Sequence, residues 1–252
     1  PYSMNYDAES GVGKADKIAA YSLQIAKQVR DQGGNGKFPL VIGGDCSVLI
    51  GCMLAMKQAG DYGLFFIDGH TDFVMPGGSH TKGAAGVDLA IVTGYGHKKL
   101  TDIDHRKPYV RESHVLAYGN RCEVKEYVDE ILNSDIRYED LKSVRRKGVE
   151  EITKRFLAML EEAELNGFWI HLDVDVLDST VMPCVDSPQP GGLTYAELKQ
   201  LLKILLRSKR VSGMNISILD PDLDASGGFA RHFAKEIGIL FSTGSAFADS
   251  KS

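Results

Sequence analysis

Short apolar segments alternate with helical patterns along the chain, and this alternation restricts the fold more than any other feature of the sequence. Near-continuous apolar segments lie at 38–44, 62–68, 114–120, 167–175 and 210–219. Residues 14–32, 47–60, 149–164 and 193–208 space their apolar side chains as amphipathic helices do, and further helices are expected near 87–94 and 228–240. Apolar strands separated by helices of about 12 residues or more indicate a mostly parallel sheet covered on both faces. The sequence therefore predicts an α/β fold.

Length and composition predict a single globular domain that spans residues 1–252. Apolar residues make up 43% and charged residues 25% of the chain, which is ordinary for a globular protein with a full core. The sequence contains no internal repeat, no low-complexity segment and no recognisable linker between domains. The charged segment 95–113 is expected to be a long surface excursion.

Charge and hydropathy argue against nucleic-acid and membrane partners. The net charge of −5 comes from 34 acidic and 29 basic residues, and the basic residues form no block. No apolar run approaches the roughly 20 residues that a membrane span requires, and the N-terminal PYSMNYDAES lacks a secretory apolar region. The four cysteines have neither the spacing of a disulfide framework nor that of a four-cysteine zinc site. We expect a cytoplasmic protein.

Acidic and metal-binding residue types gather where the expected strands end. Asp45 and Cys46 follow the first apolar segment, Asp68, His70 and Asp72 follow the second, and Asp173, Asp175 and Asp178 follow the fourth. Ligands of open α/β sheets bind in the crevice beyond the carboxyl ends of the strands. We therefore expect these side chains to meet at one edge of the sheet.

The spacing of these residues favours a cation site. Side chains two apart in an extended segment point the same way, so Asp173 and Asp175 share a face, as Asp68 and His70 do if the strand continues. Carboxylates packed closely repel one another unless a cation or protons neutralise them. Carboxylates with one imidazole suit Mn²⁺ better than Zn²⁺, Ni²⁺ or Fe²⁺. A single D-x-D alone is weaker, because aspartate at a strand end often caps the next helix.

Two other patterns in the sequence are weaker indications of function than the cation site. GVGK at 11–14 lacks the glycine and the hydroxyl residue of a phosphate-binding loop, because Ala8 and Ala15 occupy those positions. GGDCS offers Cys46 as a nucleophile at a helix start, but no partner base stands out among the seven histidines.

The motifs GGDCS, DGHTD and HLDVDVLD, in this order at separate strand ends, resemble the three metal-binding motifs of the ureohydrolases: arginase, agmatinase and formiminoglutamase. SPQPGGLTYAEL at 187–198 is similar to the segment that opens the following helix in that family, and ILDPDLD at 218–224 occupies the place of its Asn-Pro segment. The resemblance covers roughly residues 38 to 225.

The resemblance implies a three-layer αβα fold with a mostly parallel sheet of about eight strands. It also implies two Mn²⁺ ions per chain, bridged by a hydroxide that attacks the carbon of a guanidinium or amidine group. Carried over by position, the first ion is held by Cys46, Asp68, Asp72 and Asp173, and the second by Asp68, His70, Asp173 and Asp175. The family's members act on small molecules and frequently form homo-oligomers. The chain is compatible with a start after the family's first strand.

The resemblance also suggests roles for residues around the ions. Asp72 is expected to orient the hydroxide, and Asp45 and Asp178 to fix loops or ligands, unless they only cap helices and turns. Arginases have a proton-shuttling histidine where this chain has Ala85, and His80 in the same loop is the substitute that the sequence offers.

Two departures from the family bear on the metal and the substrate. Most members have histidine in place of Cys46, and a thiolate would shift the preference toward Zn²⁺, Fe²⁺ or Ni²⁺. Ile218 replaces the glutamate that faces the guanidinium in arginase. Asp220 and Asp222 are the nearby residues that could supply that charge to a substrate.

Two functional hypotheses follow. The first is a metal-dependent hydrolase of a non-peptide C–N bond in a guanidino, amidino or ureido compound. The second is an arginase-fold protein that binds metal weakly and binds a ligand without turnover. Retention of Asp68, Asp72, Asp173 and Asp175 favours the enzyme, whereas Ala85 and Ile218 favour the second reading or a changed substrate.

Overall fold

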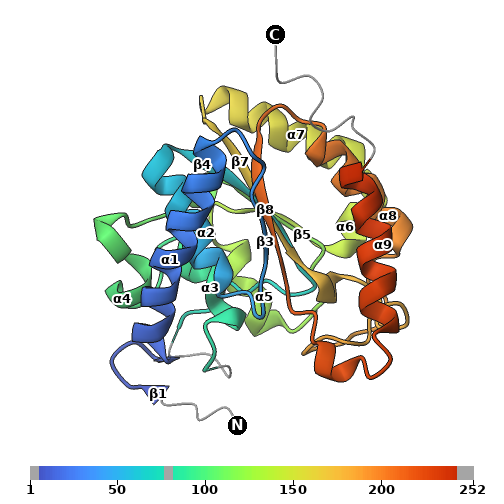
Figure 1. Ribbon diagram of the computed structural model, residues 1–252, viewed down its shortest axis with the longest axis horizontal. Helices are drawn as coiled ribbons and strands as arrows, with labels where there is room; N and C mark the ends of the chain where they lie inside the picture. The colour runs from blue at the N-terminus through green and yellow to red at the C-terminus, as the bar shows by residue number, and fades with distance from the viewer. Residues whose placement is uncertain (1–5, 77–81, 243–252) are drawn as a thin grey trace.

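The core of the molecule is a parallel sheet, seen in a computed structural model that describes residues 6–76 and 82–242 (Figure 1). The sheet has six strands in the order β3-β8-β7-β4-β5-β6, and each neighbouring pair is parallel. The strands are β3 (Leu40–Ile42), β4 (Tyr62–Ile67), β5 (Val115–Tyr118), β6 (Arg137–Glu139), β7 (Gly167–Asp173) and β8 (Val211–Ser217). The predicted α/β class is confirmed, with six strands instead of about eight.

The strand β3 forms one edge of the sheet. The described residues before β3 form the helix α1 (Ala15–Gly34) and a short antiparallel ribbon of β1 (Tyr6–Asp7) and β2 (Val12–Gly13). No described strand pairs with the outer side of β3. The Leu40 and Ile42 side chains are accordingly 41% and 77% exposed.

Helices cover both faces of the sheet, so the molecule has three layers (Figure 1). Besides α1, the helices are α2 (Val48–Ala59), α3 (Asp88–Val92), α4 (Lys98–Thr101), α5 (Lys125–Leu132), α6 (Leu141–Lys147), α7 (Val149–Glu162), α8 (Tyr195–Leu206) and α9 (Gly228–Ser242). Local sequence fixes several of their starts: Thr194 and Glu197 form a reciprocal capping box at α8. None of the helices in the described part of the chain combines the length and apolarity that a membrane crossing requires.

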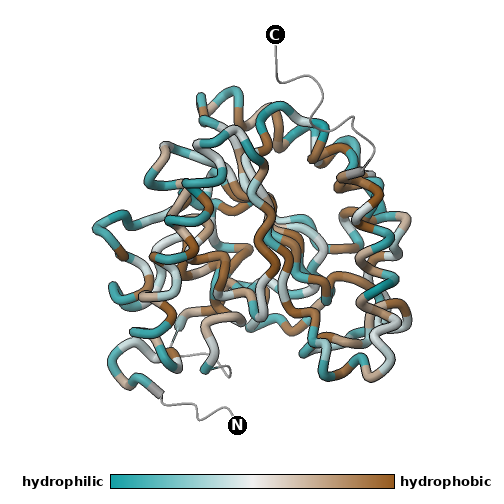
Figure 2. Tube along the Cα trace, viewed as in Figure 1, coloured by the Kyte–Doolittle hydropathy of each residue, from teal (hydrophilic) through white to brown (hydrophobic). Residues whose placement is uncertain are grey.

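Alternating side chains of the strands fill two separate cores. Leu64 and Phe66 of β4 pack with α1, α2 and α3, whereas Phe65 and Ile67 pack with α7 and α8 on the other face. Figure 2 shows the resulting hydrophobic strands at the centre and hydrophilic segments on the outer helices. Because β4 is buried on both faces, its polar continuation at Asp68 enters a site with little water around it.

The segment 95–113 lies only partly on the surface, which corrects the prediction of a surface excursion. Leu100, Ile103, Tyr109 and Val110 are buried in the core beside α2 and α3. The Tyr109 hydroxyl donates to the Leu100 carbonyl at 2.7 Å and accepts from the Ile103 amide at 2.8 Å. The charged residues between these positions masked the apolar ones in the sequence.

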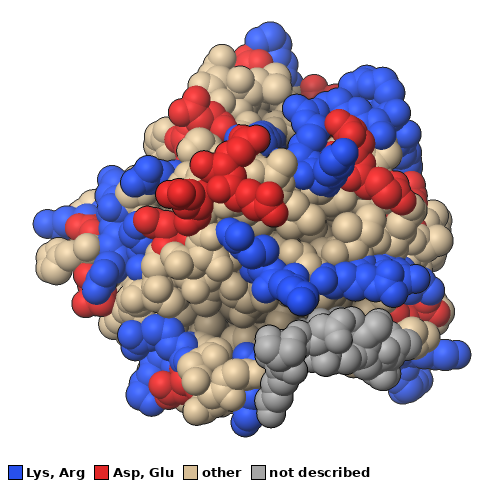
Figure 3. All heavy atoms as spheres, turned by 90° about the horizontal axis from the view of Figure 1, so that it is seen from above, with Lys and Arg blue, Asp and Glu red and all other residues tan. Residues whose placement is uncertain are grey.

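A large cavity lies far from the carboxyl ends of the strands. It has a volume of about 780 Å³ at the end where the strands begin, and Arg30, Lys37, Arg207 and Lys209 contribute to its lining. Figure 3 looks onto this end of the molecule and shows rows of basic side chains on it. None of the candidate metal ligands lines this cavity, so it is not the site that the strand-end residues form.

The packing of β8 against β7 generates a test of the fold. A Cβ atom at Gly213 would lie 2.1 Å from Cζ3 of the buried Trp169 ring. We expect Gly213→Ala to lower the free energy of unfolding by about 1–3 kcal/mol, because overpacking forces the ring or the strand to move. Urea denaturation measures this loss. Gly34→Ala, where nothing lies within 4 Å, should leave stability unchanged or slightly raised; equal stabilities of the two variants would contradict this packing.

Candidate metal centre

The carboxyl end of β4 places a buried carboxylate between two neighbouring strands. The Asp68 amide still donates to the Tyr118 carbonyl of β5 at 3.0 Å, so the residue continues the sheet. Its side chain is 1% exposed and accepts from the His70 amide at 2.7 Å through Oδ1. Oδ2 is buried and has no hydrogen-bond partner. Asp68 therefore offers a free, buried oxygen at the middle of the sheet edge.

The end of β7 adds two carboxylates beside Asp68. Asp173 accepts from the Asp175 amide at 2.7 Å, which closes a tight turn and holds both side chains at the strand end. Asp175 Oδ1 accepts from the Gly69 amide at 3.0 Å and so links the ends of β7 and β4. Each of the two aspartates is 3% exposed. The neighbouring strands thus bring the D-x-D and D-x-H-x-D motifs together.

Cys46 and His70 complete two overlapping groups of donors. The Cys46 sulfur, at the start of α2, lies 3.0 Å from Asp173 Oδ2 and 3.0 Å from the Ser217 hydroxyl. His70 Nδ1 lies 2.9 Å from Asp175 Oδ2. Ligand atoms of Cys46, Asp68 and Asp173 lie within 4.8 Å of one another, as do those of Asp68, His70 and Asp175. Asp68 is shared by the two groups.

Asp72 lies at the edge of this cluster and is held by a tyrosine. Its backbone has a φ of 42° and its side chain is 7% exposed. The Tyr127 hydroxyl donates to Asp72 Oδ1 at 3.2 Å and accepts from the Thr71 and Asp72 amides at 3.1 and 3.2 Å. Tyr127, on α5, therefore fixes the orientation of the Asp72 carboxylate.

Burial and mutual repulsion dominate the electrostatics. Burial, with Asp72 and Asp175 nearby, raises the pKa of Asp68 well above its usual range, and burial with Asp175 and Asp68 does the same to the pKa of Asp173. Burial also raises the pKa of Asp72 to about 7 and the pKa of the Cys46 thiol well above its usual range. Burial opposes protonation of His70, but its bond to Asp175 and the nearby carboxylates outweigh this and raise its pKa to about 9.

Arg121 is a cation at this site that the sequence reasoning missed. Its Nη2 donates to the Asp175 carbonyl at 2.7 Å and to the Gln189 carbonyl at 3.3 Å, and its charge lowers the pKa of Asp68. Gly69 leaves room for it, because a Cβ there would lie 2.3 Å from Arg121 Nη1 and 2.7 Å from Asp175 Oδ1. Arg121 follows the apolar segment 114–120, so the strand-end rule applied to β5 would have found it.

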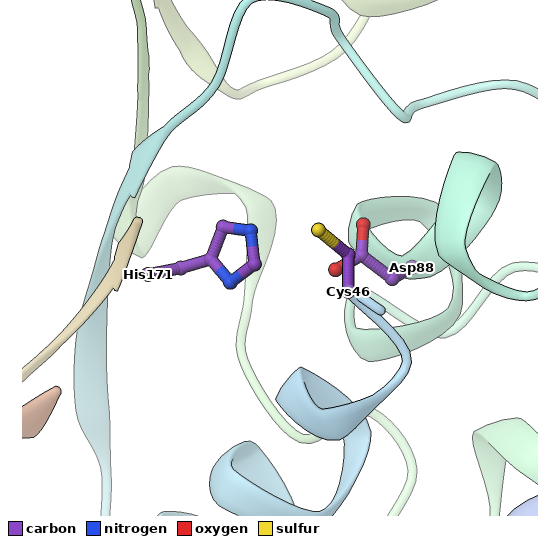
Figure 4. Close-up of side chains that lie close together, drawn as sticks. All are labelled: Cys46, Asp88 and His171. Carbon is purple, nitrogen blue, oxygen red and sulfur yellow. The ribbon is translucent and has the colours of Figure 1, made fainter. Parts of the chain in front are cut away.

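Asp88 and His171 were also missed, and both lie beside Cys46 (Figure 4). Ligand atoms of the three residues lie within 4.8 Å of one another. Asp88 begins α3, is fully buried, and has no hydrogen-bond partner for either carboxylate oxygen. His171 is fully buried on β7 and stacks on Phe66 with ring centroids 4.6 Å apart. Burial raises the pKa of Asp88 well above its usual range and lowers that of His171 to about 3.

The remaining predicted site residues that the structure describes lie outside the cluster. His80 lies outside the described residues. Asp220 accepts from the Asp222 amide at 2.9 Å and caps a short helical turn, and Asp222 is exposed. Asp45 accepts from the Ser47 amide at 2.9 Å, and Asp178 accepts from the Thr180 and Gly191 amides at 2.9 and 2.6 Å. These last two aspartates therefore cap and fix loops.

Ala85 and Ile218, two of the positions that depart from the family pattern, lie beside the loops of the site. Ala85 is half-buried in a helical turn before α3. Ile218 is 8% exposed directly after β8, with a φ of 74°, and its amide donates to the Gly44 carbonyl at 2.7 Å. A β-branched residue at positive φ is strained, and the bond to Gly44 helps hold it there.

Comparison with known proteins identifies the family of this chain. The family model of the arginases matches residues 5–241. The chain belongs to the arginase family. The arginase of Staphylococcus aureus (strain MRSA252) is 27% identical over 234 residues, which cover 92% of this chain and 77% of that protein. The resemblance to the ureohydrolases is thereby confirmed.

Solved structures agree with the family assignment. The arginase of Bacillus cereus has a TM-score of 0.84 to this chain at 26% identity, covering 92% of this chain and 81% of that one. The formimidoylglutamase of Bacillus subtilis subsp. subtilis str. 168 has a TM-score of 0.73 at 21% identity, covering 92% and 68%, and shows the shared fold.

The donors of this arginase-family chain fit a pair of divalent cations. The two groups that share Asp68 offer carboxylate oxygens, one imidazole nitrogen and one sulfur, which are ligand types for Mn²⁺ and for softer divalent ions. Asp68 Oδ2 has no protein partner, and burial and mutual repulsion raise the pKa values of Asp68 and Asp173, so the cluster binds protons or cations readily. A pair of cations would neutralise it without protons.

The pKa shifts predict how the metal-free protein responds to pH. Asp72 has a pKa of about 7 in the fold against 3.8 for an ordinary side chain, so the stability that it contributes below pH 3.8 is lost as the pH rises to about 7. His70, raised from 6.5 to about 9, contributes stability that is lost between those values. Both residues therefore act in the same direction, and the free energy of unfolding should fall as the pH rises from about 4 to about 9.

Urea unfolding of EDTA-treated protein at about pH 5 and about pH 8 measures this effect. Added Mn²⁺ should restore stability mainly at the higher pH, where cations replace the missing protons. Asp72→Asn removes one of the titrating groups and should flatten the acidic part of the curve. A metal-free protein that becomes more stable as the pH rises would show that the carboxylates are already compensated.

Proposed function

We propose that the protein is a metal-dependent hydrolase that cleaves a non-peptide C–N bond in a guanidino, amidino or ureido compound. The observation that carries the proposal is the pair of donor groups that share Asp68 at the carboxyl ends of β4 and β7. Membership of the arginase family supports the hydrolase class. The formimidoylglutamase neighbour has the same fold, so this architecture occurs with a substrate other than arginine.

In this proposal Cys46, Asp68, Asp72 and Asp173 hold the first ion, and Asp68, His70, Asp173 and Asp175 hold the second. The ions, when bound, activate a water molecule at neutral pH and neutralise charge that develops on the substrate. Mn²⁺ fits the carboxylate-rich set, and the Cys46 sulfur favours Zn²⁺, Fe²⁺ or Ni²⁺ at the first position.

The protein groups around the ions position and accept protons. Asp72, oriented by Tyr127, would accept a hydrogen bond from the attacking water and align it. Arg121 would hold the β7 turn through the Asp175 carbonyl and offset part of the negative charge. His80 stays the candidate for proton transfer to the leaving group.

The surroundings of the cluster restrict the substrate. Ile218 presents an apolar side chain where arginase has the carboxylate that pairs with the guanidinium, and an unpaired cation against it would be costly. Asp220 and Asp222 stay the candidates for binding a polar or weakly basic substrate group. Burial and the charges of Asp220, Asp45 and Asp175 raise the pKa of Asp186, so this side of the site is acidic. We propose a substrate head group smaller or less basic than that of free arginine.

A non-catalytic, ligand-binding role is the second candidate, and Ile218 and Ala85 are the residues that favour it. Self-association into a homo-oligomer stays a prediction from the resemblance. The two roles differ in turnover, so one panel of compounds separates them.

Activity against a panel of guanidino, hydroxyguanidino, ureido and formimino compounds tests the function. Release of urea, ammonia or formamide is measured with Mn²⁺, Ni²⁺ and Fe²⁺ in turn. Asp68→Asn combined with Asp173→Asn should abolish metal binding and lower the rate by about a thousandfold or more, because the ions supply several kcal/mol of transition-state stabilisation. Asp129→Asn removes a surface ion pair with Lys125 and should leave the rate unchanged.

Two results would contradict different parts of the proposal, the first its substrate and the second its catalytic role. Hydrolysis of arginine with a kcat/KM of about 10⁴ M⁻¹s⁻¹ or more would show that Ile218 does not exclude it. Silence across the panel in metal-loaded protein would favour the ligand-binding role.

Cys46→His tests the assignment of the sulfur ligand. The change should raise Mn²⁺ affinity and lower the preference for Zn²⁺, because it replaces the only soft donor of the proposed set with imidazole. Competition between the two ions, measured on both proteins, reports the preference. Cys52→Ala, which removes another buried cysteine of α2, should not alter it. An unaltered preference in Cys46→His would remove Cys46 from the ligand set.

A further inference from the structure

A chain of buried hydrogen bonds connects three side chains on the face of β7 and β8 that packs against α2. Trp169 and His171 lie two residues apart on β7, and Asn215 pairs with His171 on β8. The Trp169 indole nitrogen donates to Asn215 Oδ1 at 2.8 Å, and Asn215 Nδ2 lies 2.8 Å from His171 Nδ1. All three side chains are fully buried. Water therefore does not compete for these bonds.

The direction of each bond follows from the indole. An indole N–H can only donate, so the oxygen of the Asn215 amide must face Trp169. The amide nitrogen then faces His171, and it too can only donate. His171 Nδ1 must therefore accept and carries no proton. A doubly protonated ring is excluded, because its Nδ1–H and the Asn215 Nδ2–H would both be donors and could not bond to each other. The proton of the ring lies on Nε2.

The free end of this chain points at Cys46 and Asp88. Figure 4 shows the Cys46 sulfur directed toward the imidazole ring, with Asp88 beside it. His171 Nε2 and both Asp88 oxygens are buried and have no hydrogen-bond partner. By residue type and spacing, Cys46, Asp88 and His171 have the composition of a metal site. A protonated nitrogen cannot bind a metal ion, so the tautomer excludes His171 as a ligand.

We propose that His171 is a positioning residue that directs its Nε2–H at the Cys46 sulfur and the Asp88 carboxylate, and thereby orients the sulfur as a ligand of the first ion. The role of the sulfur rests on the proposed function, whereas the tautomer of His171 does not. Outer hydrogen bonds of this kind orient metal ligands, and their loss typically lowers metal affinity by about 10–100-fold.

The tautomer can be measured on the metal-free full chain. Two-bond ¹H–¹⁵N NMR spectra distinguish protonated from unprotonated ring nitrogens, and His171→Phe identifies the His171 signals by their loss. We expect an unprotonated Nδ1 and a protonated Nε2. Asn215→Asp provides an isosteric switch, because an aspartate can accept from both Trp169 and a protonated His171 Nδ1. The variant should move the proton to Nδ1. A wild-type ring protonated on Nδ1, or no change in Asn215→Asp, would overturn the inference.

The effect on the sulfur is read from Co²⁺ binding, without an activity assay. Co²⁺ bound to a thiolate gives a charge-transfer absorption band that oxygen and nitrogen ligands do not give. His171→Phe keeps a ring against Phe66 but removes the N–H, and it should lower Co²⁺ affinity at the sulfur position by about 10–100-fold and weaken the band. His114→Phe is the matched control, because His114 lies before β5 at the other end of the strand, and it should behave as wild type.

Asn215→Asp gives a second measurement if His171→Phe does not fold. Moving the ring proton to Nδ1 takes the N–H away from the sulfur, so this variant should also weaken the band and lower Co²⁺ affinity at the sulfur position. A normal band and affinity in His171→Phe, or in Asn215→Asp where the first variant does not fold, would overturn the positioning role and leave the proposed function standing. A wild-type protein that binds Co²⁺ without the band would instead remove Cys46 from the proposed metal centre.

Discussion

Mutual repulsion among buried carboxylates is the constraint on which this end of the molecule depends. Asp68, Asp173 and Asp175 are almost completely buried at the carboxyl ends of two neighbouring strands. Each ionised carboxylate in such a place raises the energy of the others, as their pKa shifts indicate. A fold tolerates this only where strong backbone geometry holds the groups together and a partner supplies positive charge.

The parallel sheet provides that geometry. β4 is paired with β7 along its whole length, so the ends of the two strands are in register, and the Gly69 amide extends the connection to Asp175. Arg121 reaches the same turn from the end of β5. The carboxylates are therefore positioned by the backbone before any ion binds, which keeps the reorganisation needed for binding small. Tyr127 and the relay from Trp169 to His171 extend the same preorganisation to Asp72 and Cys46.

The sequence predicts the parts of this site that depend on strand ends and leaves out those that depend on packing. Asp68, His70, Asp173 and Asp175 follow apolar strands, and in a parallel sheet such residues must converge. Tyr127 comes from a helix in a region where no element was predicted, so its contact with Asp72 exists only in three dimensions.

Asp88 and His171 illustrate a different difficulty. In the sequence, Asp88 has the position of an ordinary helix-capping residue. His171 lies inside an apolar strand, where a histidine is usually part of the core. Their nearness to Cys46 depends on how α3 packs against the end of the sheet. The segment 95–113 was misjudged for a related reason, because burial of Leu100 and Tyr109 follows from packing that charged neighbours conceal. The number of strands could not be predicted from the sequence either. It depends on which segments pair at the edges of the sheet, and β3 is one of these edges.

The strained backbone at Ile218 has a consequence for how this protein could change over evolutionary time. Replacement of a buried isoleucine by a polar residue ordinarily reduces stability, and this loss limits which mutations a protein tolerates during evolution. At the Ile218 φ of 74° part of this loss of stability is offset, because asparagine, aspartate or glycine adopts such a backbone conformation with less strain than a β-branched residue does. A polar residue can therefore appear next to Ser217, which contacts Cys46, with a smaller folding penalty than elsewhere in the core. Under the proposed function, such a single change would alter the surroundings of the substrate without a compensating mutation first.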